Sequence, residues 1–193
     1  DAQQIAAVFD DGSLKVWAVA TGEPIDEVND APGSSLVQRP DGAFASCGPD
    51  AILTTISSQG GWVLERVLGG ENDSAQFSDR VNALCFSPDG KTLATGSGEA
   101  SRSGDVAFFD VATGKLTASW KDHHADSILS LDFSPNGKRL ASGAADKIAR
   151  VTEIATKNQV SLFEGHTHYV TGVKFRADGR VLASKPISII QLA

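Results

Sequence analysis

Short apolar runs alternate with polar turns along the whole chain, and one turn recurs at a nearly regular spacing. Its Asp or Asn falls at Asp41, Asp89, Asn136 and Asp178, which are 48, 47 and 42 residues apart. Asp-Gly and Asn-Gly pairs are typical of tight turns between antiparallel strands. The spacing therefore predicts a structural repeat of 42 to 48 residues.

Each repeat unit is predicted to contain four short strands, the first of which precedes the turn. The second strands are apolar runs with small residues, at 43–46, 93–96, 140–143 and 181–184. The third strands end near an aromatic residue or its substitute, at 14–17, 106–109 and 148–152. Fourth strands close the units, as at 115–120 and 159–163. Four such strands cannot bury both faces of their sheet alone, so neighbouring units must stack, and radial stacking gives a propeller with only short, protected edges.

Short motifs in these units resemble the WD40 repeat. Gly165-His166 matches its Gly-His element, residues 86–91 (Phe-Ser-Pro-Asp-Gly-Lys) match its first hairpin, and Val16-Trp17 and Phe109-Asp110 occupy its Trp-Asp position. The resemblance implies an all-β, WD40-type β-propeller, here an incomplete ring of about four to five four-stranded blades. The chain is also similar to bacterial WD40 proteins, some of which are joined to cytochrome-c-like domains.

The resemblance further implies structural roles for a set of polar residues. WD40 blades often carry hydrogen-bonded His, Ser or Thr, Asp and Trp that pin the loop before a blade to its third strand, and such a network helps only when its members are satisfied. The residues at these blade-anchoring positions are His124, Ser142 and Asp146 in the fourth unit, Asp11 and Trp17 in the first, and His166 in the fifth.

No unit has the complete set of anchoring residues. Thr152 replaces Trp in the fourth unit, Ala7 replaces Ser in the first, and Phe77 replaces His in the third. We therefore expect apolar packing to hold the blades more than this polar set does.

The repeat divides one predicted domain, residues 1–193, into five approximate units. These are a partial blade at 1–30, blades at 31–74, 75–122 and 123–164, and a partial blade at 165–193. The first and last units both contain second and third strands, so they cannot fuse into one blade. By comparison with the fourth unit, about four turn residues are absent near Ser184 and Lys185, so either this hairpin is truncated or the sequence skips a loop. We therefore expect missing sequence, an open array, or a ring that further blades or another chain complete.

Charge and hydropathy argue against two classes of partner, nucleic acid and membrane, although a local basic patch stays open. The formal net charge is −7, whereas binding nucleic acid needs a basic surface that displaces counterions. No stretch approaches the roughly 18 apolar residues of a membrane span, and the first residues show no secretory signal pattern. We expect a soluble protein, cytoplasmic or periplasmic, without direct membrane insertion. The absence of Met, even at position 1, leaves open a removed N-terminal segment.

The two cysteines, Cys47 and Cys85, both fall within predicted strands. They are too few for a disulfide-stapled mini-fold and too sparse for a zinc or haem-attachment motif. We expect both to be small buried hydrophobic residues with ordinary thiols, with a disulfide between neighbouring strands as the alternative.

Three patterns that could carry chemistry are better explained by structure. The histidines at 123, 124, 166 and 168 could suggest a metal site, but His124 and His166 hold structural positions in the family, and His123 and His168 are expected at loops or the surface. The Ser, His and Asp of the fourth unit could suggest a hydrolase triad, but no nucleophile elbow surrounds the serine. The Gly-rich segments 69–70 and 96–104 open no helix and carry no Walker lysine. We therefore expect no catalytic residue, no metal and no cofactor.

The remaining candidate is a loop surface that binds a protein partner. Two loops, 69–74 and 98–104, exceed the repeat minimum and are expected on one rim of the propeller, where rigid strands hold variable loops. The candidate partner-binding residues are Arg102, Glu71, Asp73, Trp62 and Arg66, since Arg and aromatic residues dominate binding hot spots.

These patterns predict a non-catalytic scaffold that presents its loops to a partner protein or to other subunits of a complex. The alternative is an accessory domain of a larger redox (cytochrome-c-like) or hydrolytic protein whose catalytic part lies elsewhere. A self-contained propeller enzyme is disfavoured, because no convergent acid-base pair repeats on the inner strands.

Overall fold

The computed structural model describes residues 4–9, 11, 13–29, 35–38, 40, 44–47, 53–57, 63–68, 77 and 79–186. All regular structure among these residues is β-strand. Since this part of the chain contains no helix, it contains none that could cross a membrane.

The strands form five antiparallel sheets that follow the chain order. The first sheet contains β1 (Gln4–Val8), β2 (Leu14–Ala18) and β3 (Pro24–Val28). The second contains β4 (Ser35–Gln38), β5 (Phe44–Cys47), β6 (Leu53–Ser57) and β7 (Val63–Leu68). The third contains β8 (Val81–Phe86), β9 (Thr92–Ser97), β10 (Gly104–Asp110) and β11 (Leu116–His124).

The fourth and fifth sheets complete the described fold. The fourth contains β12 (Ile128–Phe133), β13 (Arg139–Ala144), β14 (Ala149–Glu153) and β15 (Gln159–Phe163). The fifth contains β16 (Val170–Phe175) and β17 (Leu182–Pro186). β11 continues to His124, so the unit boundary expected after residue 122 falls inside this strand.

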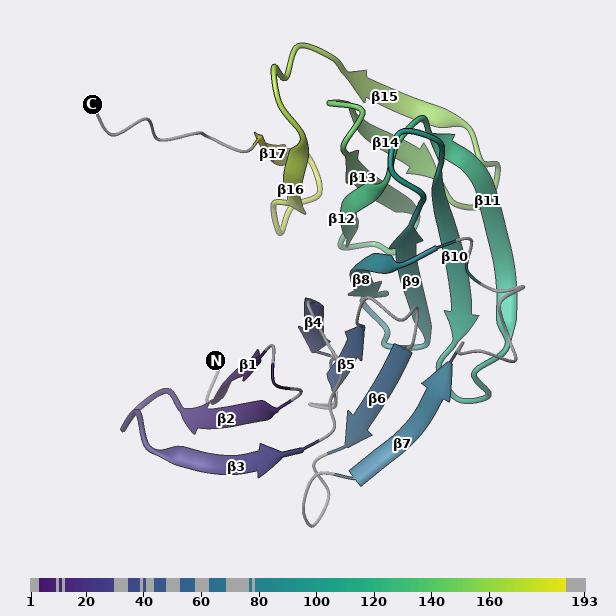
Figure 1. The fold of residues 1–193 in the computed structure, drawn as a ribbon. Coiled ribbons are helices and arrows are strands. Elements are labelled where there is room, and N and C mark those ends of the chain that lie inside the picture. The colour runs from purple at the N-terminus through teal and green to yellow at the C-terminus, as the bar shows by residue number, and fades with distance from the viewer. Residues whose placement is uncertain are drawn as a thin grey trace.

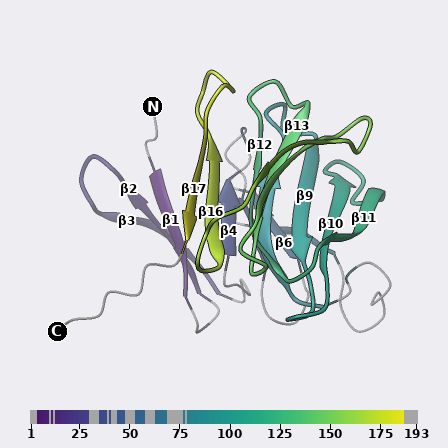
Figure 2. The same cartoon turned by 90° about the horizontal axis from the view of Figure 1, so that it is seen from above.

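The sheets are arranged around an open arc (Figure 1). β4, β8, β12 and β16 line the inside of the arc, and each contacts the next in this order. In the view turned by 90°, the inner strands stand upright and the hairpin turns gather at their ends (Figure 2). This arrangement confirms the predicted all-β propeller with an incomplete ring of blades.

The recurring turn closes the hairpins β8–β9, β12–β13 and β16–β17. Its glycine adopts a left-handed conformation that other residues rarely adopt. The φ angles are 70° at Gly90, 69° at Gly137 and 68° at Gly179. In the first hairpin, the Asp89 carboxylate accepts hydrogen bonds from the Ser87 hydroxyl (2.6 Å) and the Lys91 N–H (3.1 Å), which hold the pKa of Asp89 below its usual value. The repeated turn residues are thus the ones that shape the hairpins.

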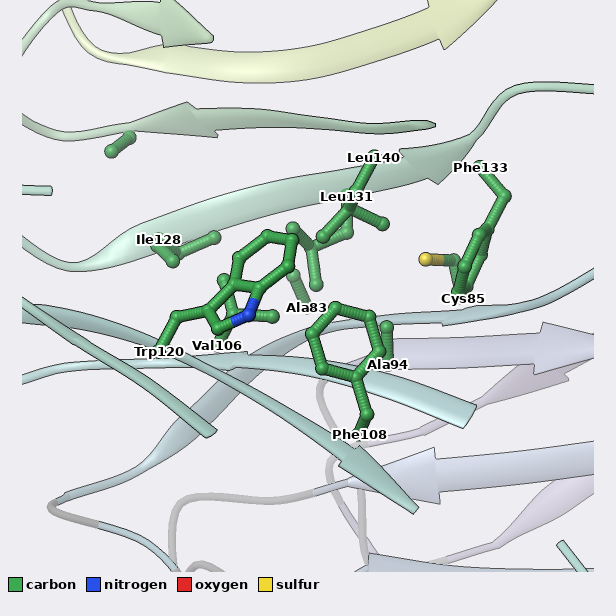
Figure 3. Close-up of a cluster of buried hydrophobic side chains, with 11 residues drawn as sticks. Ala83, Cys85, Ala94, Val106, Phe108, Trp120, Ile128, Leu131, Phe133 and Leu140 are labelled. Atoms are coloured by element: carbon green, nitrogen blue, oxygen red, sulfur yellow. The ribbon is translucent and has the colours of Figure 1, made fainter. Parts of the chain in front are cut away.

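The largest apolar cluster lies between the third and fourth sheets (Figure 3). Since successive residues of a strand face opposite sides, Val106 and Phe108 of β10 face the fourth sheet, whereas Ala107 and Phe109 face the second. Phe108 and Trp120 meet edge-on, with ring centroids 4.8 Å apart. A sheet inside the arc therefore buries apolar residues on both of its faces.

Cys85 belongs to this cluster and is a free thiol. Burial raises the pKa of Cys85 well above its usual value, and the nearby Asp132 carboxylate raises it further. Cys85 therefore packs as a small apolar side chain, as the sequence predicts. The side chain of Cys47 lies outside the described part of the structure.

Hydrogen bonds from side chains to the backbone join the inner strands β12 and β16. Ser130 Oγ accepts from the Val173 N–H (3.1 Å). The Asp132 carboxylate accepts from the Phe175 N–H (2.7 Å) and from Lys174 Nζ (2.6 Å). These bonds give partners to N–H groups on the inner edge of β16, which would otherwise depend on water or a further strand.

Two glycines at corresponding positions let successive sheets approach closely. A Cβ built on Gly96 of β9 would lie 2.5 Å from Ile128 Cγ2 of the fourth sheet. One built on Gly143 of β13 would lie 2.7 Å from Val170 Cγ1 of the fifth sheet. Neither position has room for a side chain without movement of the neighbouring sheet.

We predict that Gly143→Ala lowers the free energy of unfolding by about 1 to 3 kcal/mol, because the added methyl overpacks the contact with Val170. Gly172→Ala is the matched control. The nearest atom to a Cβ there is Lys185 Cβ at 3.6 Å, so we expect a change within about 0.5 kcal/mol. Urea unfolding of both variants measures the difference. Equal effects would contradict close packing between the fourth and fifth sheets.

Candidate functional site

Two loops of neighbouring sheets meet at one rim of the arc. The first is the 98–104 loop between β9 and β10, and the second is the connection at 125–127 between β11 and β12. The Ser101 N–H donates to Asp126 Oδ1 (2.8 Å), and Ser127 Oγ donates to the Gly98 carbonyl (3.0 Å). These bonds fix the long loop of the third sheet against the start of the fourth.

Glycine is required at both ends of the 98–104 loop. Gly98 has a φ of 155°, and a Cβ on it would lie 2.1 Å from the Ser103 carbonyl oxygen. A Cβ on Gly104 would lie 2.2 Å from the Asp126 carbonyl oxygen and 2.8 Å from His124 Cβ. The loop is therefore packed closely against the next sheet at its base.

Arg102 lies at the tip of this loop with 72% of its side chain exposed. Its guanidinium pairs with Glu99 of the same loop, and the Arg102 N–H donates to the Glu99 carbonyl (3.1 Å). The guanidinium is accessible to a partner because it is exposed. An exposed ion pair of this kind contributes little to stability, so exchanging Glu99 for a group of the partner would cost little.

Of the other predicted partner-binding residues, the structure describes the backbone of Arg66 alone. Glu71, Asp73 and Trp62 lie outside the described residues, as does the whole 69–74 loop. Arg66 lies in β7, opposite Thr55 of β6, and its side chain is outside the description. The segment that enters β8 does reach the same rim as the 98–104 loop, because Val81 pairs with Ser97.

Beneath this rim, three of the predicted anchoring residues form a buried hydrogen-bonded network. His124 Nε2 lies 2.8 Å from Ser142 Oγ, and His124 Nδ1 lies 2.9 Å from Asp146 Oδ2. The Asp146 carboxylate also accepts from the N–H groups of Ala125 (3.1 Å) and Ile148 (3.0 Å). Burial acts to raise the pKa of Asp146, but the bonds from His124 and from these backbone groups outweigh it and hold the pKa below its usual value.

His123 also belongs to this network, so the prediction that it lies at a loop or the surface is wrong. It is half-buried at the end of β11, with Nε2 3.2 Å from Ser142 Oγ and its ring 5.1 Å from that of Trp120. The register of β10 and β11 shifts between the pairs at Gly104 and Val106, where Asp122 has a φ of 52°. Such a bulge turns the following side chain inward. No motif in the sequence signals it.

The fifth sheet repeats one contact of this network, and the third sheet replaces it. In the fifth sheet, His166 Nε2 lies 2.9 Å from Ser184 Oγ. In the third, Phe77 stands at the His position, and its ring lies 5.6 Å from that of Phe109, which is equivalent to Thr152 of the fourth sheet.

The first sheet holds the remaining predicted anchors, Asp11 and Trp17. Asp11 accepts from the N–H (2.9 Å) and hydroxyl (2.7 Å) of Ser13, which lower the pKa of Asp11. Trp17 packs edge-on against Phe9, with ring centroids 6.3 Å apart. Asp11 and Trp17 thus contact different neighbours.

The hydroxyl at the centre of the buried network is not accessible to a substrate. Ser142 is fully buried, and its hydroxyl is shared between two imidazoles, so no substrate can reach it. Among the described residues, no three or more His, Cys, Asp or Glu side chains gather in a way that could hold a metal ion.

We predict that acid weakens the fold through His123. Burial, together with the nearby charges of His124 and Arg150, lowers the pKa of His123 from 6.5 to about 4. The unfolded chain therefore takes up a proton near pH 6.5 that the folded chain takes up only near pH 4. Stability is unaffected by this group above that window and falls as the pH drops through it, by about 1 to 3 kcal/mol in total.

Urea unfolding at about pH 7 and about pH 4.5 measures this loss. His123→Gln, which cannot titrate, should lose clearly less stability over that range. His168→Gln, at an exposed position, is the matched control and should follow the wild type. Identical pH profiles for all three proteins would show that His123 is solvated.

Comparison with known proteins agrees with this architecture. A family model described as "WD domain, G-beta repeat" matches residues 69–110, 114–152 and 157–184, which together make up more than half of the 193 residues. The second segment begins before β11 and ends within β14, so one sequence repeat spans the junction between two sheets. No individual curated protein matches the chain. With these matches and the radial sheets, the chain belongs to the WD40 repeat family.

Proposed function

We propose that this protein is a non-catalytic interaction scaffold that presents its rim loops to a partner protein or to other subunits of a complex. WD40 repeats act in general as protein-interaction scaffolds. The observation that supports this role here is the 98–104 loop, which is fixed at its base and carries an exposed Arg102 at its tip.

A fixed loop is well suited to binding. Ordering a mobile loop on association costs free energy, and a loop that is already ordered avoids most of that cost. The bonds from Ser101 to Asp126 and from Ser127 to Gly98 order the loop before any partner arrives. Since both bonds cross between sheets, the stacking that stabilises the propeller also shapes its binding surface.

Arg102 is the residue we propose as the anchor of this surface. An arginine offers a planar set of donors and a long apolar stem, and arginine is enriched among residues that dominate interface energetics. Its pairing with Glu99 presents both charges at the rim. We propose that Glu71 and Asp73, with Trp62 and Arg66, extend the surface toward the preceding blade.

We predict that Arg102→Glu reduces partner recovery by about tenfold or more when the tagged chain is used for affinity capture from its native cells, because the change reverses the anchoring charge. The control is Lys91→Glu, which makes the same charge change at an exposed position on the opposite end of β9. It should leave recovery unchanged. Both variants should unfold within about 0.5 kcal/mol of the wild type. Equal recovery with Arg102→Glu and the wild type would reject the 98–104 loop as the binding surface.

A further inference from the structure

A polar pocket of about 370 Å³ lies on the outer side of the arc, between the third and fourth sheets. We call it the outer pocket. Trp120 and His123 of β11 line one side, Arg150 and Thr152 of β14 line the other, and Lys157 of the β14–β15 turn borders it. In Figure 1, β11 and β15 are the outermost strands of these two sheets.

The outer pocket coincides with a departure from the WD40 pattern. Thr152 stands where the family carries Trp, and it pairs with Leu140 of the neighbouring strand. In the third sheet, the corresponding pair is Leu93 with Phe109, whose ring fills the space against Phe77. A threonine side chain is much smaller than either ring, so space remains in the fourth sheet.

Two buried polar atoms of the outer pocket have no hydrogen-bond partner among the residues that the structure describes. They are Thr152 Oγ1 and Arg150 Nε, and Thr152 is only 2% exposed. Arg150 Nη1 donates to Gln159 Oε1 at 3.0 Å, which leaves the Nε edge of the guanidinium unused by this bond. Buried polar groups in folded proteins are almost always paired, so each of these atoms leaves a donor that an acceptor entering the pocket can bind.

The charges at the outer pocket favour an anion of low charge. Arg150 and Lys157 contribute positive charge, and Asp122 is the single carboxylate among the lining residues. Lys121 also lines the pocket, but its Nζ lies 2.9 Å from Asp105 Oδ2, which compensates its charge. The balance suits a monoanion better than a dianion.

Lys157 occupies a strained position beside the outer pocket. Its φ is 60°, in the left-handed region that glycine tolerates best. The matching turns of other units carry glycine, with φ of 70° at Gly22 and 71° at Gly114. A lysine in this conformation has a stability cost, and strained residues of this kind concentrate at functional sites.

We propose that the outer pocket binds a carboxylate group, held by the Nε edge of Arg150, the hydroxyl of Thr152 and the ammonium of Lys157. The edge of a guanidinium presents two parallel N–H donors that match the two oxygens of a carboxylate. The site is separate from the 98–104 loop and goes beyond the proposed scaffold role. The carboxylate belongs either to a free small acid or to an acidic side chain of a peptide.

The test follows the Nε–H signal of Arg150 in ¹H–¹⁵N NMR spectra, identified by its loss in Arg150→Lys. The probes are propionate, propionamide, inorganic phosphate, and the blocked peptides acetyl-Gly-Glu-Gly-amide and acetyl-Gly-Gln-Gly-amide, at constant ionic strength. We expect a saturable shift with propionate or the Glu peptide, and at least tenfold weaker effects with the amides and phosphate. The tighter of the two carboxylate probes identifies the source. Effects of the amides or phosphate as strong as those of the carboxylates, or no saturable shift with any probe, would overturn the assignment.

Three variants separate binding from folding, with carboxylate affinity measured by calorimetry. Arg150→Lys keeps the charge but removes the paired donors and should weaken binding at least tenfold. Thr152→Val keeps the shape but removes the hydroxyl and should weaken it severalfold. Lys157→Gly should weaken binding severalfold while raising the unfolding midpoint, because it removes both the charge and the backbone strain. Unchanged affinity in all three variants would also overturn the proposal.

Discussion

The contact between neighbouring sheets is the interaction on which the rest of this structure depends. The third and fourth sheets are apolar on both faces, so neither face can be left in water without losing the main favourable contribution to folding. The third sheet illustrates this, since Phe108 packs toward the fourth sheet and Phe109 toward the second. Gly96 lets the third and fourth sheets approach closely, and Gly143 does so for the fourth and fifth, whose inner edges Asp132 links.

The contact between neighbouring sheets also shapes the two candidate binding surfaces, the 98–104 loop and the outer pocket. The 98–104 loop is ordered by bonds to the next sheet, so it can offer Arg102 without a large ordering cost on binding. At each junction between sheets, one position on the third strand decides whether the outer side is filled or open, and this position is Phe109 in the third sheet and Thr152 in the fourth. Phe109 fills it in one sheet, and Thr152 leaves it open in the next. The repeated strands therefore form a rigid framework, and the candidate binding sites lie where a unit departs from the repeat, at the 98–104 loop and at Thr152.

Much of the fold could be predicted from local patterns. The spacing of the Asp-Gly and Asn-Gly turns identified the hairpins, because those residues have the conformational preferences that the turns require. His124, Ser142 and Asp146, which the repeat pattern assigns to blade-anchoring positions, are hydrogen-bonded to one another in the structure. The role of His123 could not be predicted, because it depends on a bulge at Asp122 whose conformation no residue type specifies. The outer pocket could not be predicted for a related reason. The replacement of Trp by Thr152 is visible in the sequence, but the unused Nε of Arg150 beside it depends on cross-strand register.

Hydrogen exchange measured residue by residue in Ile128→Ala tests most directly whether the sheets are stable only together. Ile128 belongs to the fourth sheet, is fully buried, and packs into the third. If stacking is the source of stability, the amides of β9 and β10 should lose as much protection as those of β12 and β13, although the mutation removes no atom from the third sheet. Loss of protection confined to β12 and β13, with the third sheet unchanged, would show that each sheet is stable by itself and would contradict this account.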